Sequence, residues 1–96
     1  MTMDRSTCRV ATPHASRYLQ QLCKHWAHKF QVSFDPQQGR IELPDGRLLE
    51  MTASAAELHL CATAPAADMA QFQDIIAKHI AGFGFREQLV FDWQAD

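Results

Sequence analysis

The sequence lacks the features by which several protein classes are recognised. It has no run of about 18 apolar residues that could span a bilayer, and its first residues include no apolar stretch typical of an export signal. The formal net charge is −2, which does not supply the basic face that nucleic acid or an anionic membrane surface requires. We therefore expect a cytoplasmic protein with neither nucleic acid nor membrane as a partner.

Cysteine is scarce, and its occurrences form no motif. The chain has an odd number of cysteines, Cys8, Cys23 and Cys61. They are widely separated and include no CxxC pair. In a chain without an export signal, such thiols are expected to be reduced rather than bridged. On a helix, Cys23 and His25 would diverge by about 200°, so they do not form a nucleophile–base pair, and Cys23 is expected to be a small buried thiol.

The apolar residues of the chain are sufficient for one core. Of 96 residues, 47% are hydrophobic and 21% are charged, a balance typical of globular proteins. This length predicts a single domain over residues 1–96. The patterns described below place its ordered core at about residues 7–94.

Two segments have the periodicity of amphipathic helices. The first is predicted at residues 14–29, after Thr12 as a cap and Pro13 in the first turn. The second is predicted from Pro65 to about residue 81, with Gly82 as its end. Each helix presents one apolar stripe, formed by Ala15, Leu19, Leu22, Trp26 and Phe30 in the first and by Met69, Phe72, Ile76, His79, Ile80 and Phe83 in the second.

The other segments alternate with a period of two, as half-buried strands do. Strands are predicted near residues 7–12, 30–34, 40–43, 49–53, 57–63 and 89–93, and Asp45 with Gly46 favours a tight hairpin. The order β-α-β-β-β-β-α-β predicts an α+β fold, an antiparallel sheet with two helices packed on one face. The second face of the sheet, on which we place Cys61, is predicted to be polar, and it faces either solvent or a homodimer partner.

Five histidines are many for a chain of this length. His25 and His28 are three apart on the first predicted helix and can share one metal ion, with His79 or Glu87 as a further ligand. Histidines at the border of an apolar stripe are more typical of half-buried packing residues, and the metal site is kept as the alternative. No complete catalytic constellation is present, and we do not predict an enzyme. A metal ion is the one cofactor that these residues suggest.

Three segments and one aromatic residue carry a family resemblance. Residues 15–29, 39–41 and 83–89, together with Trp93, resemble the signature of a small bacterial family known as domain of unknown function DUF2218. The resemblance covers roughly residues 9–93. It implies a small binding or accessory domain that supports iron–siderophore handling beside a flavin-dependent siderophore-interacting reductase.

The family's signature residues have no catalytic assignment that could be transferred to this chain. They fall here on Ser16, Arg17, Tyr18, Cys23, His25, His28, His79, Arg86 and Glu87. Arginine favours bidentate contacts with carboxylate or phosphate. We therefore take Arg17, Tyr18 and Arg86 as candidates for contact with an anion or another small ligand.

Overall fold

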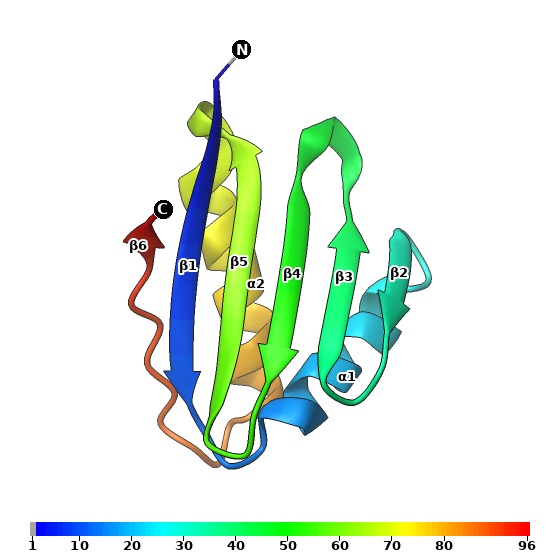
Figure 1. Cartoon of the computed structure of the whole chain (residues 1–96), viewed down its shortest axis with the longest axis vertical. Coiled ribbons are helices and arrows are strands. Elements are labelled where there is room, and N and C mark those ends of the chain that lie inside the picture. Colours follow the sequence, from blue (N-terminus) through cyan, green and yellow to red (C-terminus); the bar gives the residue numbers. More distant parts are fainter. Residues whose placement is uncertain (1) are drawn as a thin grey trace.

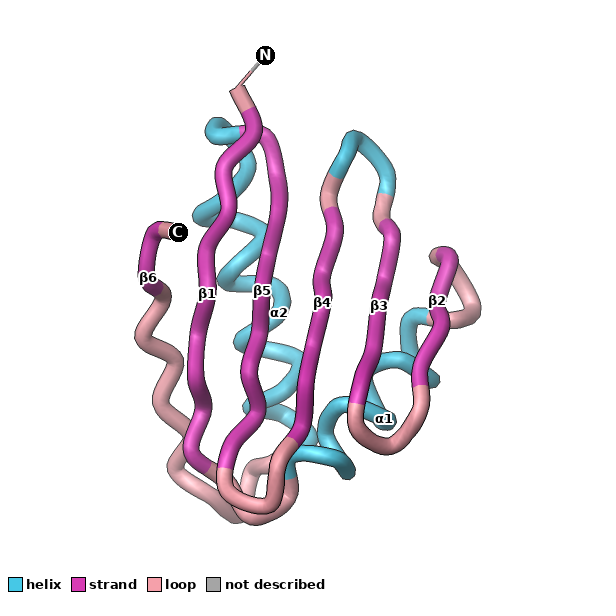
Figure 2. The backbone as a smooth tube through the Cα atoms, in the orientation of Figure 1, coloured by secondary structure: helices cyan, strands magenta, loops and turns pink. Residues whose placement is uncertain are grey.

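The computed structural model describes residues 2–96 and confirms the α+β class. Within these residues a single six-stranded antiparallel sheet has the order β2-β3-β4-β5-β1-β6, and both helices lie behind the same face of it (Figures 1 and 2). The elements are β1 (Met3–Ala11), α1 (Ala15–Trp26), β2 (Gln31–Phe34), β3 (Gln38–Glu42), β4 (Leu48–Ala53), β5 (Glu57–Pro65), α2 (Met69–Phe83) and β6 (Gln94–Ala95).

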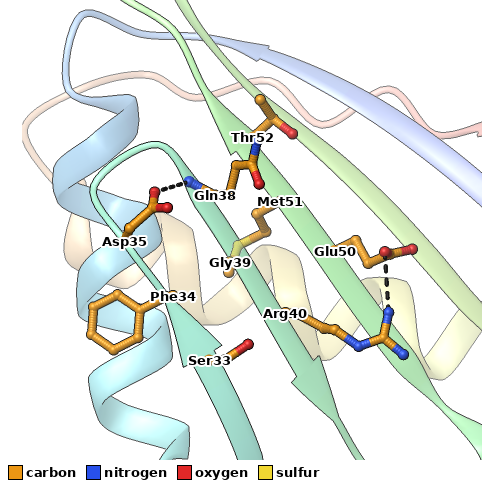
Figure 3. Close-up of a pocket in the computed structure, with 9 residues that line it drawn as sticks. All are labelled: Ser33, Phe34, Asp35, Gln38, Gly39, Arg40, Glu50, Met51 and Thr52. Carbon is orange, nitrogen blue, oxygen red and sulfur yellow. Dashed lines mark hydrogen bonds and ion pairs between the residues drawn. The ribbon is translucent and has the colours of Figure 1, made fainter.

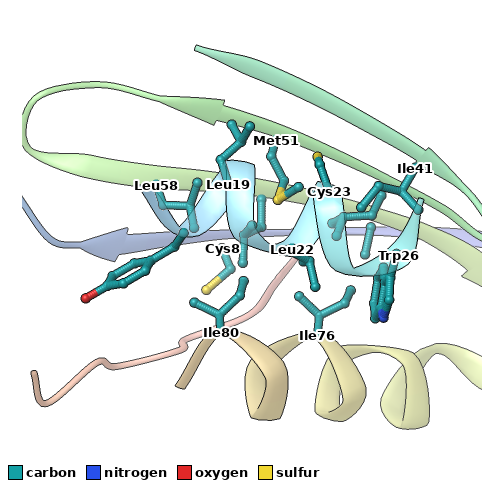
Figure 4. Close-up of a cluster of buried hydrophobic side chains, with 14 of the residues drawn as sticks. Cys8, Leu19, Leu22, Cys23, Trp26, Ile41, Met51, Leu58, Ile76 and Ile80 are labelled. Carbon is teal, nitrogen blue, oxygen red and sulfur yellow. The ribbon is translucent and has the colours of Figure 1, made fainter. Parts of the chain in front are cut away.

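The core lies between the sheet and the two helices. The apolar stripe of α1 faces the sheet and α2. Leu19 and Leu22 are fully buried there, Leu19 towards the strands and Leu22 opposite Ile76 on α2 (Figure 4). Trp26 ends the stripe at 5% exposure. Burial of each such side chain contributes about 1.5–3 kcal/mol, so the shared apolar face holds the two helices in place.

Helix α1 ends at Trp26, three residues before the predicted end. The amide nitrogens of Lys29 and Phe30 both donate to the Trp26 carbonyl, at 3.0 and 2.9 Å, which closes the helix in a turn. His28 therefore lies beyond the end of the helix. No helix within residues 2–96 has both the length and the apolar character needed to cross a membrane.

The prediction that Gly82 ends the second helix is wrong, because α2 continues to Phe83 and Gly84 caps it. A Cβ on Gly82 would meet nothing within 4 Å, whereas one on Gly84 would lie 2.8 Å from the Tyr18 hydroxyl. The Gly84 amide donates to the Ile80 carbonyl at 3.0 Å. The helix therefore ends where the backbone must pass close to Tyr18.

The prediction of a strand at residues 89–93 is also wrong. The C-terminal segment runs beside β1 (Figure 1), but regular pairing is confined to β6, opposite Ser6 and Thr7. The alternation itself correctly identified Leu89, Phe91 and Trp93 as the side chains that pack on the core. A segment can therefore alternate between core-facing and solvent-facing side chains without pairing regularly with a neighbouring strand.

The hairpin between β3 and β4 forms at the predicted residues. Asp45 and Gly46 have φ angles of 66° and 79°, the left-handed values that both central residues of a type I′ turn need. At the same end of the sheet, β1 begins at Met3 rather than residue 7, because β5 extends to Pro65 and pairs with it.

Two glycines with opposite surroundings test this packing. A Cβ on Gly39 would lie 2.9 Å from the Cys23 sulfur and 3.2 Å from Leu19 Cδ2, so Gly39→Ala should lower the free energy of unfolding by about 1–3 kcal/mol. Gly82→Ala places a methyl group in open space on a helix and should raise that free energy by about 0.5–1 kcal/mol. Urea unfolding of both variants measures the difference, and equal stabilities would contradict the packing described here.

Candidate ligand-binding site

The start of α1 and the end of α2 border a hollow of about 390 Å³. This volume lies within the range of small-molecule sites, roughly 300–1,000 Å³. We call it the Tyr18 hollow, and its lining consists of His14, Arg17, Tyr18, Phe83, Gly84, Phe85, Arg86 and Glu87. All three residues predicted from the sequence to contact an anion or other ligand are among them.

A hydrogen-bonded network forms the floor of the Tyr18 hollow. The Tyr18 hydroxyl donates to Glu87 Oε2, and the Thr12 hydroxyl lies 2.8 Å from Oε1 of the same carboxylate. The Thr12 oxygen in turn accepts from the His14 amide at 3.0 Å. Tyr18 and Thr12 are both buried, so the network joins the β1–α1 connection to the segment after α2.

The network shifts the pKa values of Glu87 and Tyr18 in opposite directions. The Tyr18 hydrogen bond, helped by the Thr12 hydroxyl and the nearby His14 charge, outweighs desolvation and lowers the pKa of Glu87 below its ordinary value of 4.5. Burial, reinforced by Glu87, raises the pKa of Tyr18 above its ordinary value of 10. At neutral pH, Tyr18 is therefore a neutral donor and Glu87 a carboxylate.

The rim of the hollow carries positive charge that the rest of the chain does not balance. Neither Arg17 nor Arg86 forms an ion pair with a carboxylate among residues 2–96. The Arg86 guanidinium carbon lies 5.5 Å from the centre of the Phe85 ring, which is 75% exposed. Two guanidinium groups against the single Glu87 carboxylate leave a net positive charge, which favours an anion.

The sheet face that the helices leave uncovered has a different electrostatic character. Arg40 pairs with Glu42 at 3.2 Å and with Glu50 at 3.3 Å, and the second of these pairs crosses a shallow hollow between β2, β3 and β4 (Figure 3). Arg9 likewise pairs with Glu57 at 2.9 Å. These charges are therefore matched within the face itself, and whether the face meets solvent or a homodimer partner stays a prediction.

Cys61 lies on that outer face as predicted, but it is only 9% exposed. Arg5 covers the thiol, with a guanidinium nitrogen 3.2 Å from the sulfur. The alternation of the strand correctly gave the direction of the side chain. Its burial depends on a neighbouring strand that the local pattern does not reveal.

Of the four predicted metal ligands, the structure brings only two together. The rings of His25 and His79 have centroids 5.3 Å apart. His28 lies beyond the end of α1, and Glu87 accepts from Tyr18 and Thr12. Among residues 2–96, no group of three histidines, cysteines or acidic residues is arranged to hold a metal ion.

Two residues that support the Tyr18 hollow were not predicted from the sequence as site residues. Thr12 was assigned only as a helix cap, and its hydroxyl bonds to a carboxylate 75 residues away in the chain. Gly84 was assigned no role, although its missing side chain makes room for Tyr18. The one local signal for Gly84 is its position between two bulky aromatic residues.

Comparisons with known proteins agree with the fold. A family described as "Uncharacterized protein conserved in bacteria (DUF2218)" matches residues 7–94. The NMR structure of PA4090 from Pseudomonas aeruginosa is 36% identical in sequence, with 95% of each chain covered and a TM-score of 0.79. No curated protein matches the chain. The likeness extends over nearly the whole chain and includes both sides of the Tyr18 hollow.

The lowered pKa of Glu87 predicts a specific acid dependence of stability. The folded state favours the carboxylate, so its contribution is complete above the ordinary value of 4.5 and is lost as the pH falls through the lower folded-state pKa. Glu87→Gln removes this contribution. The drop in unfolding free energy between about pH 7 and about pH 3 should therefore be smaller in the variant than in the wild type, as measured by urea unfolding.

The variant Tyr18→Phe tests the cause of the lowered Glu87 pKa, which carbon-13 NMR of the carboxyl group can follow. Loss of the hydroxyl donor should move the pKa of the Glu87 carboxyl up towards its ordinary value. If that pKa stayed at its wild-type position, the hydrogen bond could not be its main cause.

Proposed function

The chain belongs to the DUF2218 family of uncharacterized bacterial proteins, and from this premise we propose that it is a small binding or accessory domain that holds an anionic small molecule in the Tyr18 hollow. The observation that supports this proposal most directly is the position of Arg17 and Arg86. They lie far apart in the sequence, border one hollow and have no carboxylate partner of their own among residues 2–96.

Guanidinium groups suit this role because their donors are arranged to contact two oxygens of one anion. Arg17 belongs to the first turn of α1, and Arg86 follows the end of α2. An anion bound by both arginines would link the start of α1 to the end of α2. The Tyr18–Glu87 hydrogen bond links the same two parts of the chain. The exposed ring of Phe85 adds an apolar surface at the rim.

The titratable groups in the floor favour binding over catalysis. The single hydroxyl proton of Tyr18 is donated to Glu87, and both oxygens of that carboxylate accept hydrogen bonds. These bonds also lower the pKa of Glu87, which makes it a weaker base, whereas an effective general base has a pKa near the working pH. We therefore assign Tyr18 and Glu87 to the support of the hollow, and the contact with the ligand to the two arginines.

The finer part of the proposal is that this domain supports iron–siderophore handling with a flavin-dependent reductase. Its ground is the family resemblance of the signature segments. Ferric complexes of hydroxycarboxylates and catecholates present negatively charged oxygens at their edges, and paired arginines can contact such oxygens. The Tyr18 hollow would receive one edge of such a complex, and the reductase would act on the iron.

Isothermal titration with ferric citrate, free citrate and inorganic phosphate tests the anion site. The double variant Arg17→Ala/Arg86→Ala should bind at least about tenfold more weakly than the wild type, equivalent to about 1.4 kcal/mol. Arg9→Ala/Arg40→Ala is the matched control, because it removes the same charge from the outer sheet face. An equal loss in both double variants, or no binding of any of these anions to the wild type, would contradict the site.

The accessory role has a separate test. A purified flavin-dependent siderophore reductase, mixed with this chain and a ferric siderophore, should co-elute with it in gel filtration and release or absorb heat on titration. Absence of both signals would remove the reductase from the proposal. The anion titration would still decide the Tyr18 hollow on its own.

A further inference from the structure

The imidazoles of His25 and His79 meet across the border between α1 and α2. Their centroids are 5.3 Å apart, with the ring planes inclined at 50°. Two imidazoles bound to adjacent positions of one ion, at metal–nitrogen distances of about 2 Å, have centroids about 4.5–5.2 Å apart. The observed separation is therefore close to that of a pair of cis metal ligands.

The hydrogen bond of His79 fixes which of its nitrogens can bind an ion. Its Nδ1 lies 2.8 Å from the Ile75 carbonyl oxygen. Because a carbonyl only accepts, Nδ1 carries a proton, and in the neutral ring Nε2 is the nitrogen with the free lone pair. An Nδ1–H bond to a backbone carbonyl is the usual second interaction of a metal-binding histidine, since it sets the tautomer and orients the ring.

Aromatic neighbours hold both rings in place. The ring of Trp26 packs edge-on against His79 at 5.2 Å, and the ring of Phe83 packs edge-on against His25 at 6.2 Å. Trp26 is buried and His79 half-buried, whereas His25 is exposed to solvent. The pair is thus supported from the core on one side and open to an entering ion and its water on the other.

We propose that His25 and His79 form a two-imidazole site for a late divalent transition metal, with Cu²⁺ the ion it binds most tightly. Among residues 2–96 no third histidine, cysteine or acidic residue joins them, so water completes the coordination. Cu²⁺ accepts such a mixed nitrogen and oxygen set in tetragonal geometry and stands highest in the affinity order of divalent metals. Structural zinc sites instead use four protein ligands.

Proton–nitrogen NMR of the wild-type chain with substoichiometric Cu²⁺ locates the ion without any substitution. Signals of His25, Trp26 and His79 should broaden first, because the ion is paramagnetic and lies between these side chains. Earlier broadening around His14, His28 or His59 would overturn the proposal.

Three single variants then assign the ligands by their affinity for Cu²⁺. His25→Ala and His79→Ala should each weaken binding at least about tenfold, whereas His28→Ala should leave it unchanged. His28 is the matched control, because it follows His25 by three residues and could form an alternative pair with it. If His28→Ala weakened binding and His79→Ala did not, the ion would be held at the end of α1 without α2, and the interhelical site would be refuted.

Tryptophan fluorescence provides an independent reading of the same site. In Trp93→Phe the remaining tryptophan is Trp26, whose ring is 5.2 Å from His79. Cu²⁺ should quench this fluorescence in a saturable way at the affinity found by NMR. Quenching that rises without saturation would show collisional contact only and would contradict a bound ion.

Discussion

The packing of α1 against α2 on one face of the sheet is the constraint on which both candidate sites depend. The first turn of α1 lies near the end of α2, and the Tyr18 hydroxyl and Glu87 carboxylate join there. Tyr18 and His25 are seven residues apart on α1, two turns along the same face, or about 10 Å. The anion hollow and the imidazole pair are therefore neighbouring features of one border, and Phe83 contacts both.

The sequence predicted the parts of the fold that a local repeat can report. The apolar stripes of both helices were correct except for Phe30, which lies beyond the end of α1, because a residue's position in a helical turn decides whether it faces the core. Strand order was not predictable, since pairing such as that of β1 with β5 joins residues far apart in the chain. The end of α2 was missed because Gly82 and Gly84 look alike in the sequence, and only contact with Tyr18 distinguishes them.

The sequence suggested candidate site residues from their chemistry, but it did not show which groups each of them contacts. Arg17 and Arg86 were named as candidates for ligand contact, and the structure places both at one hollow. A carboxylate such as Glu87 suits a metal ion and a hydroxyl donor equally well. The structure gives Glu87 the hydroxyls of Tyr18 and Thr12. For His28 the cause of the difference is local: α1 stops at Trp26, so His28 follows the end of the helix, whereas His79 on α2 lies against His25.

The distribution of charge separates the two sides of the molecule. On the outer sheet face, guanidinium groups such as those of Arg9 and Arg40 are matched by carboxylates on the same or adjacent strands. Along the helix border, Arg17 and Arg86 have no such match within residues 2–96, although the chain as a whole has a net charge of −2. Screening confines charge–charge interactions to about 8–10 Å, so a local excess of positive charge attracts a small anion even though the chain as a whole is negative. An anionic ligand would therefore bind with more favourable electrostatic free energy at the helix border than on the open face of the sheet.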